Sequence, residues 1–165
     1  MKQSDIPFHH SSIDLKNCTL LPLEGSDAEW IVVKMASMDP WKRLGHLESS
    51  LLRYLTGMNP GLARYQISVD GETAGVCCIR YPWLRGPFLE LICVLEEFQG
   101  RGIGRAALGW MAQEAKGVCP NIWSTVSSFN ERAVAFYREL GFSEVVTLKD
   151  FMREGYDEIL LRKPI

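Results

Sequence analysis

The sequence predicts a single α/β domain: a mixed, mostly antiparallel sheet of about seven strands with helices packed on both faces. The chain has 165 residues, of which 47% are hydrophobic and 23% charged, as in ordinary globular proteins. A chain of this length buries about 70% of the surface that its unfolded form exposes, so it can support one hydrophobic core. Strand-like and helix-like segments follow one another without long linkers or repeats.

The first third of the chain is predicted to form a strand followed by two helices. The strand covers residues 18–23 (CTLLPL), and the first helix covers residues 28–38. Ser26 or Asp27 can cap that helix at its N-terminus, and the following Asp-Pro pair should stop it. The second helix is predicted over residues 46–55, because four leucines recur there at helical spacing.

The middle of the chain is predicted to be an antiparallel meander. Residues 64–69 and 73–80 are typical of two strands, and the Asp-Gly pair between them favours a tight hairpin turn. Residues 81–87 should form a turn-rich connection. A largely buried strand then covers residues 88–95 (FLELICVL), in which Glu90 is the one charged residue.

The last third of the chain is predicted to hold two helices and three strands. A helix begins near Ile103, presents apolar residues at helical spacing and ends near residue 117. The remaining elements are a strand over residues 122–126, a helix that Asn130 can cap and Gly141 can end, and strands over residues 142–148 and 158–162.

Composition and charge exclude several classes of protein. Residues 1–17 are polar and lack the apolar centre of a signal peptide, so a flexible lead-in before a domain over residues 18–165 is expected. No apolar run approaches the ~20 residues that span a bilayer. We therefore expect no membrane partner and a cytoplasmic location. The net charge of −2 argues against nucleic-acid binding, because such domains usually carry a basic excess.

The cysteines and histidines indicate neither a disulfide framework nor a metal site. The five cysteines are an odd number without CxxC spacing, and the three histidines lack the spacing of metal ligands. Reduced cysteines and no metal are therefore expected.

Three alternating glycines, Gly100, Gly102 and Gly104, lie in the segment EFQGRGIGRAALGWM directly before a predicted helix. The first N–H groups of a helix lack intrahelical partners, and the helix dipole places about half a positive charge there. Without side chains the backbone can approach a phosphate closely, and Arg101 and Arg105 can add charge-assisted hydrogen bonds. We interpret the segment as a pyrophosphate-binding loop; a plain glycine-rich turn is the alternative.

The same segment matches part of the GxGxxG/A pattern of dinucleotide-binding folds. That reading needs an acidic residue ~20 residues further on, at the end of the next strand. Here the next strand ends in small polar residues, and the lysine and hydroxyl of a Walker A sequence are missing. A nucleotide-dependent redox enzyme is therefore disfavoured.

Two sequence blocks resemble the GNAT superfamily of acyl-CoA-dependent N-acetyltransferases. Gln99 and the second and third glycines match its QxxGxG signature, and the preceding strand ends at Val94, five residues earlier. Residues 130–142 (NERAVAFYRELGF) are similar to its NxxAxxxYxxxGF block. The resemblance implies the GNAT fold, in which two central strands splay apart, over about residues 20–162.

The resemblance implies that acetyl-CoA is the co-substrate. Its pantetheine arm would bond to the main chain of Ile92, Cys93 and Val94; a nucleophilic Cys93 thiol is the alternative. Asn130 is either only a helix cap or also a contact of the cofactor. The pyrophosphate would lie in the glycine-rich loop, whose candidate residues are Gln99, Gly100, Arg101, Gly102, Ile103, Gly104 and Arg105.

Two residues are the candidates for proton transfer. Tyr137 matches the residue that in many GNAT enzymes protonates the departing CoA thiolate, and a phenol with an unperturbed pKa of about 10 can donate at pH 7. A plain core aromatic is the alternative. Glu90 is the candidate general base, or else a solvent-facing carboxylate. Some relatives carry a glutamate where this sequence has Thr125, so the assignment of the base stays open.

The sequence and the resemblance together predict an acyltransferase that moves an acetyl group from acetyl-CoA to a primary amine of a small molecule by direct attack. Backbone N–H groups near Val94 would polarise the thioester carbonyl. Trp41 and Trp83 are candidate contacts of the acceptor, with a plain core role as the alternative. A protein acceptor, at an N-terminus or a lysine, and a non-catalytic acyl-CoA-binding module are the competing functions. The acyl chain length and the oligomeric state stay open, a homodimer included.

Overall fold

A computed structural model describes residues 7–165. One mixed sheet of eight strands, in the order β1-β2-β3-β4-β5-β6-β8-β7, forms its centre. In chain order the elements are β1 (Ile13–Asp14), β2 (Thr19–Pro22), α1 (Gly25–Ala36), α2 (Trp41–Leu44), α3 (Glu48–Thr56), β3 (Leu62–Val69), β4 (Glu72–Trp83), β5 (Gly86–Val94), a 3-10 turn (Glu96–Phe98), α4 (Ile103–Ala115), β6 (Asn121–Ser127), α5 (Glu131–Glu139), β7 (Ser143–Arg153) and β8 (Tyr156–Pro164).

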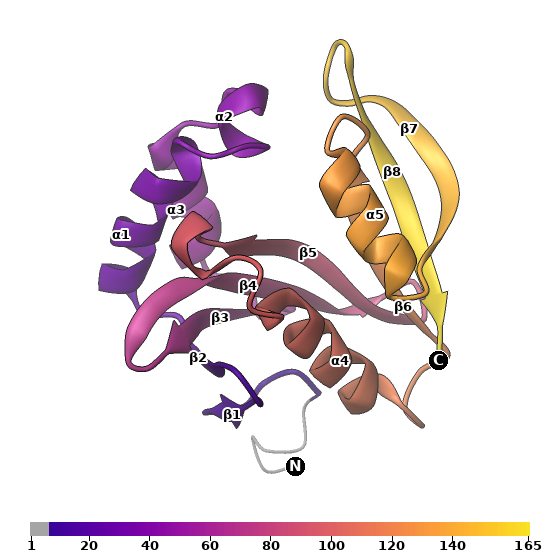
Figure 1. Cartoon of the computed structure of the whole chain (residues 1–165). Coiled ribbons are helices and arrows are strands. Elements are labelled where there is room, and N and C mark those ends of the chain that lie inside the picture. Colours follow the sequence, from indigo (N-terminus) through magenta and orange to yellow (C-terminus); the bar gives the residue numbers. More distant parts are fainter. Residues whose placement is uncertain (1–6) are drawn as a thin grey trace.

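The sheet divides where its single parallel pair of strands separates. β5 pairs with β6 at only two positions, Phe88 with Trp123 and Leu89 with Ser124, although both strands continue beyond these residues. All the other neighbouring strands are antiparallel. Figure 1 shows α1–α3 on one side of the molecule and α5 with the β7–β8 hairpin on the other. The predicted splay of the central strands is therefore present.

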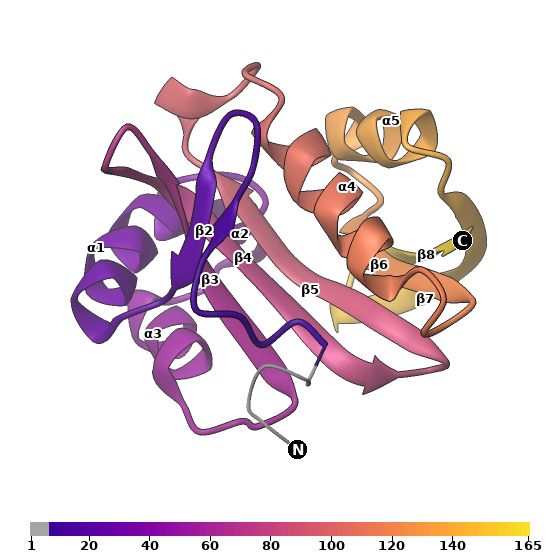
Figure 2. The same ribbon diagram turned by 90° about the horizontal axis from the view of Figure 1, so that it is seen from below.

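Helices cover both faces of the sheet, as two neighbouring residues of β3 demonstrate. The Tyr65 ring packs edge-on against Trp110 of α4, with ring centroids 5.8 Å apart. The Arg64 guanidinium lies 5.9 Å from the ring centroid of Tyr54 in α3. Because successive side chains of a strand point to opposite faces, α3 and α4 lie on opposite sides of the sheet. Figure 2 shows α4 lying over the strands close to β5 and β6.

The segment expected to be a flexible lead-in contributes contacts to the domain from residue 8 onward. Phe8 is fully buried, and its carbonyl oxygen accepts a hydrogen bond of 2.5 Å from the Tyr65 hydroxyl. His10 lies 2.5 Å from the Glu114 carboxylate of α4, and residues 13–14 add the edge strand β1. The expectation for residues 1–6 lies outside the described residues.

Three further expectations are corrected by the backbone. The sheet has eight strands because β1 adds one to the expected seven. The predicted connection over residues 81–87 is wrong: β4 extends to Trp83 and β5 begins at Gly86, because these two residues pair across a short turn. A short helix, α2, lies between the two predicted helices.

Among residues 7–165, no helix has the length and apolar character that a bilayer crossing requires.

The close approach of β5 to β6 depends on Gly86. A Cβ atom at this position would overlap the backbone carbonyl of Asn121, which cannot move without displacing β6. We expect Gly86→Ala to lower the free energy of unfolding by about 2–3 kcal/mol, the usual cost of overpacking, as measured by urea denaturation. Gly109→Ala is the matched control: its Cβ meets open space on α4, so it should be neutral or gain up to about 1 kcal/mol of helix propensity. Equal stabilities of the two variants would contradict the steric argument.

Candidate active site

A cavity of about 820 Å³ passes through the sheet where β5 and β6 separate. Four consecutive residues of β6 line it: Ser124, Thr125, Val126 and Ser127. Alternating residues of a strand point to opposite faces. The cavity therefore connects the face covered by α5 with the opposite face, where it opens between α2 and the end of the β7–β8 hairpin.

The predicted anion loop lies at the start of α4 and has the expected conformation. Gly100 and Gly102 adopt φ values of 75° and 74°, in the left-handed region that favours glycine. Gly102 is the N-cap residue, and no side chain from residues 7–165 caps the helix. Within that range the first N–H groups of α4 therefore have neither intrahelical nor side-chain partners. A Cβ at Gly104 would lie 3.1 Å from Phe136, so its absence keeps this end of the helix open.

A second cavity, of about 540 Å³, lies in front of these N–H groups. It shares Ile92, Asn130, Ala133 and Phe136 with the first cavity, so the two adjoin. Free N–H groups, the positive end of a helix dipole and open space are the features that a diphosphate needs. The predicted residues that line this cavity are Ile92, Val94, Gln99, Gly100, Gly102, Ile103, Gly104, Arg105 and Asn130.

The two arginines of the loop point in different directions. Arg105 lines the cavity and makes an exposed ion pair of 3.4 Å with Glu139. Arg101 instead donates a 2.8 Å hydrogen bond to the carbonyl oxygen of Glu97, and its guanidinium lies 4.9 Å from the ring centroid of Phe98. Its side chain is therefore turned back along the chain in this structure.

The end of β5 carries main-chain groups that β6 leaves free, over residues 90–94. The Gln99 amide donates a 2.9 Å hydrogen bond to the carbonyl oxygen of Val94, which joins the strand end to the loop. Arg132 of α5, which the sequence analysis missed, donates a 3.0 Å hydrogen bond to the oxygen of the same amide. Cys93 is 1% exposed, and burial raises the pKa of its thiol to about 12. A thiol in this state is a poor nucleophile, so only the backbone of Cys93 is suited to a role.

Tyr137 lies at the inner end of the main cavity, on α5. Its hydroxyl lies 3.1 Å from the Ser124 hydroxyl, a partner that sequence reasoning did not find. Burial raises the pKa of Tyr137 to about 12, so the phenol stays protonated across the physiological range. Asn130 caps α5 by accepting a 3.2 Å hydrogen bond from the Ala133 N–H, and it also lines both cavities.

Glu90 lines the main cavity, but it is already paired. Its carboxylate receives two hydrogen bonds from the guanidinium of Arg80 on β4, one of them 3.0 Å long. The register between β4 and β5 shifts at this point, so Glu90 is the bulged residue. Both oxygens of the Glu90 carboxylate are therefore occupied by donors of Arg80.

A second carboxylate of the cavity was missed from the sequence. Glu158 of β8 is 5% exposed and lines the cavity, where it accepts a hydrogen bond from the Ser127 hydroxyl. Burial raises its pKa, and the hydrogen bonds from Ser127 and Thr125 offset part of this rise. His46 also lines the cavity, and burial together with Arg153 lowers its pKa, so the imidazole is mainly neutral at pH 7.

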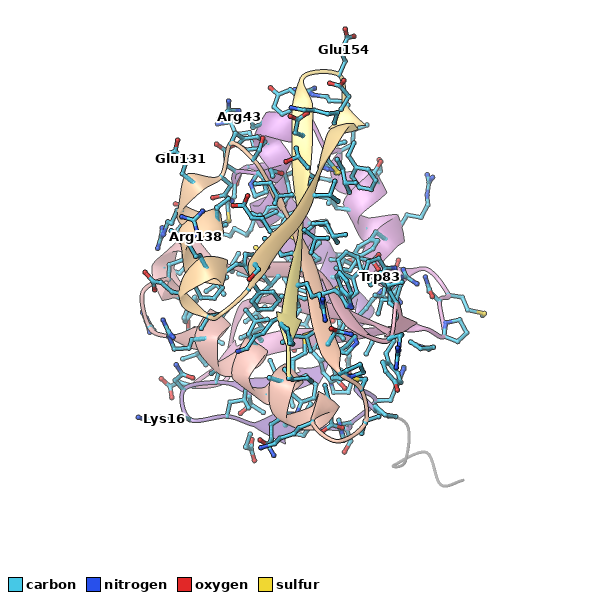
Figure 3. The ribbon with its side chains drawn as sticks, turned by 90° about the vertical axis from the view of Figure 1, so that its right-hand side faces the viewer. Lys16, Arg43, Trp83, Glu131, Arg138 and Glu154 are labelled. Atoms are coloured by element: carbon cyan, nitrogen blue, oxygen red, sulfur yellow. The ribbon has the colours of Figure 1, made fainter. Side chains whose placement is uncertain are left out.

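The predicted acceptor contacts, Trp41 and Trp83, both line the outer part of the cavity. Trp83 stacks on Phe88 at 4.7 Å between ring centroids. Figure 3 looks onto the β7–β8 hairpin, which carries Glu154 at its tip and has Arg43 of α2 behind it. Arg153 of the hairpin donates a 2.8 Å hydrogen bond to the carbonyl oxygen of Arg43, so the hairpin and α2 are joined across the cavity mouth.

Comparison with known proteins adds independent information. The model of a family described as "Acetyltransferase (GNAT) family" matches residues 31–142. An N-alpha-acetyltransferase of Sulfurisphaera tokodaii is 29% identical over 62% of this chain and 70% of its own. A "[Ribosomal protein bS18]-alanine N-acetyltransferase" of Salmonella typhimurium is 28% identical over 94% of this chain and 98% of its own. The crystal structure of an acetyltransferase from Thermus thermophilus has the same fold, with a TM-score of 0.72 at 22% identity over 93% of this chain and all of that one.

Proposed function

This chain belongs to the GNAT acetyltransferase family, and we propose that it transfers an acetyl group from acetyl-CoA to the N-terminal α-amino group of a polypeptide. The observation that carries the proposal is the continuous pair of cavities: one begins at the free N–H groups of α4, and the other ends between α2 and the β7–β8 hairpin. A donor with a diphosphate and an acceptor with an amine can thus enter from opposite faces and meet where β5 and β6 separate.

On the donor side, the residues of this chain fit coenzyme A. The N–H groups at the start of α4 and Arg105 would hold the diphosphate, and the free main chain at the end of β5 would bind the pantetheine arm. Acetyl-CoA, when bound, supplies an acetyl group as a thioester that an amine can attack. Tyr137 would donate its proton to the leaving sulfur, and a main-chain N–H near Val94 would polarise the carbonyl.

The choice of an α-amine rests on the names of the two relatives and on proton affinity. An α-amino group has a pKa of about 8 and a lysine one of about 10.4. At pH 7 deprotonation therefore costs about 1.4 kcal/mol for the α-amine and about 4–5 kcal/mol for the lysine, at 1.36 kcal/mol per pKa unit. A carboxylate base inside the cavity is therefore strong enough to deprotonate an α-amine but too weak for a lysine side chain.

A small primary amine is the second candidate acceptor, because one feature of the mouth favours it. The hydrogen bond from Arg153 to Arg43 joins the two walls, and Gly45 lies close to Arg153 as well. This bridge narrows the access to the cavity, which suits a compact substrate.

Thiol release from acetyl-CoA decides between the acceptors. We expect the purified protein to release CoA with peptides that have a free N-terminus, and mass spectrometry to find one acetyl group on the α-nitrogen. The same peptides with a blocked N-terminus and an internal lysine should give at most background. Turnover with polyamines or amino acids alone would establish the small-molecule acceptor instead. Binding of acetyl-CoA without release for any acceptor would identify a binding module and contradict the proposal.

A further inference from the structure

Building on the proposed function, we propose that Glu158 of β8 is the general base that removes the proton from the acceptor amine. It is a buried carboxylate that lines the reaction cavity, and its hydrogen-bond partner is the hydroxyl of Ser127 on the neighbouring strand. Nothing in the packing of a hydrophobic core requires a carboxylate at this position. Its place in the cavity supplies the reason.

The strand register places this carboxylate on the acceptor side of the sheet. Glu158 pairs directly with Ser127 in the antiparallel β6–β8 ladder, so their side chains point to the same face. Ser124, which contacts Tyr137, belongs to the alternate set of β6 residues and points to the other face. The proton donor and the proton acceptor thus approach one cavity from opposite faces of the sheet. This arrangement fits a reaction in which donor and acceptor enter from opposite sides.

The other titratable groups of the cavity are less suited to accept a proton. Both carboxylate oxygens of Glu90 on β5 accept hydrogen bonds from the Arg80 guanidinium of β4. His46, which follows α2, lines the outer part of the cavity near Trp41 and the hairpin residue Arg153. Tyr137 on α5 stays protonated. In the described part of the chain, Glu158 is the lining carboxylate without a cationic partner.

The charge of the cavity lining and the burial of Glu158 both favour a role as general base. Among residues 7–165, Glu90 and Glu158 are the only acidic residues that line the cavity, and no lysine or arginine lines it. Because the Arg80 guanidinium compensates the charge of Glu90, an incoming ammonium group meets the uncompensated lining carboxylate at Glu158. Burial also raises the pKa of Glu158, which brings its proton affinity closer to that of an α-amine. A proton transfer between the two is then less unfavourable than it would be to an exposed carboxylate.

The protons balance over one turnover. The acceptor enters as an ammonium ion and gives one proton to Glu158, which later passes it to solvent. The neutral nitrogen then forms a bond to the acetyl carbon, and the bond from that carbon to sulfur breaks. The proton that Tyr137 gives to the sulfur is replaced by the second proton of the nitrogen. The products are an amide, a free thiol and one released proton.

Glu158→Gln tests the proposal, because glutamine keeps the shape and can still accept the hydrogen bond from Ser127. With an alanine-initiated hexapeptide as the acceptor at pH 7, we expect kcat/KM to fall about 10²-fold, the usual contribution of a general base. The Kd for CoA should stay within about threefold of the wild-type value, since Glu158 does not line the cavity in front of the α4 N–H groups. A variant that keeps the wild-type kcat/KM would overturn the role of Glu158 alone. A wild type without turnover would overturn the proposed function itself.

Stability supplies a readout that does not depend on activity. Burial raises the pKa of Glu158 above its ordinary 4.5, so between the ordinary and the raised pKa the folded protein holds a proton that the unfolded chain releases. The free energy of unfolding therefore falls as the pH rises through this window. Glu158→Gln cannot ionise, so it should be more stable than the wild type at pH 8 and equally stable below pH 4.5. A variant that is less stable at pH 8 would indicate a structural carboxylate and contradict the proposal.

Moving the carboxylate to the neighbouring strand completes the test. Thr125 pairs with Leu160 and therefore lies on the same face as Glu158, one diagonal step away. We expect Thr125→Glu in the Glu158→Gln background to recover at least about tenfold in kcat/KM, because a carboxylate again faces the acceptor. Thr125→Gln in the same background is the matched control and should recover nothing. Equal rates for the two double variants would refute a proton-acceptor role.

Discussion

Replacing Tyr137 by phenylalanine is expected to lower kcat about 10³-fold, within the range that a positioned general acid contributes. The phenol is buried, and burial raises its pKa to about 12, so it carries its proton at every pH at which the protein would be assayed. Without this proton the sulfur must leave as a thiolate beside apolar lining residues such as Leu89, Ile92 and Phe136, where an anion is poorly solvated. The Kd for CoA should change less than about threefold, because the hydroxyl contacts Ser124 rather than the diphosphate loop. Steady-state kinetics and calorimetry measure the two quantities.

The fold should tolerate this substitution. The ring keeps its edge-on contacts with Phe136 and Phe142, at 5.5 Å and 5.4 Å between centroids. Ser124 does not lose its last partner, because its hydroxyl also donates a 3.1 Å hydrogen bond to the carbonyl oxygen of Leu89.

Tyr65→Phe is the matched control for Tyr137→Phe. Tyr65 is also a buried tyrosine, and burial raises its pKa to about 12 as well, but its hydroxyl bonds to the carbonyl oxygen of Phe8, away from the cavity. Tyr65→Phe should lose about 1–3 kcal/mol of stability, because the hydroxyl also accepts a 2.9 Å hydrogen bond from the His10 N–H and two hydrogen bonds are lost. It should keep its kcat. A Tyr137→Phe variant with wild-type kcat would remove this residue from the mechanism.

The sequence anticipated the lining of the cavity in front of α4 better than that of the larger cavity, and strand pairing explains the difference. The loop glycines, Gln99 and Tyr137 lie within two short blocks whose spacing is local, so their relation to the cavity could be anticipated. Ser127 and Glu158 are 31 residues apart and meet only through the register of β6 with β8. The sequence pattern does not show which of the adjacent acids, Asp157 or Glu158, has the buried side chain.

Two other features depended on contacts distant in the chain. Arg80 and Glu90 pair because β4 and β5 are neighbours and because a bulge lies at Glu90, which residue patterns do not reveal. The polar character of the first residues suggested fraying, but one aromatic residue among them, Phe8, is fully buried. A single large apolar side chain is enough to attach such a segment, since burying it contributes about 1.5–3 kcal/mol.

Gly104→Val should weaken CoA binding about 100-fold. Glycine at the second position of α4 leaves the N–H groups of the first turn open to the cavity in which we propose that the diphosphate binds. A Cβ there would already lie 3.1 Å from the Phe136 ring, so a valine must displace that ring or extend into the space in front of the N–H groups. Losing one or two hydrogen bonds to a charged phosphate, at about 1.5–3 kcal/mol each, corresponds to roughly that factor at 1.4 kcal/mol per tenfold. Titration calorimetry with CoA measures it.

Gly109→Val separates this effect from a general weakening of α4. Both glycines lie in the same helix, but a Cβ at Gly109 meets nothing within 4 Å. Valine and glycine differ by only about 0.5 kcal/mol or less in helix propensity, so this contribution is small and common to both variants. Only Gly104→Val also adds a side chain beside the cavity in front of α4. Unchanged affinity in Gly109→Val together with the loss in Gly104→Val would locate the diphosphate at the start of α4. Equal affinities in the two variants would place the diphosphate elsewhere, and the assignment of the donor side would fail with it.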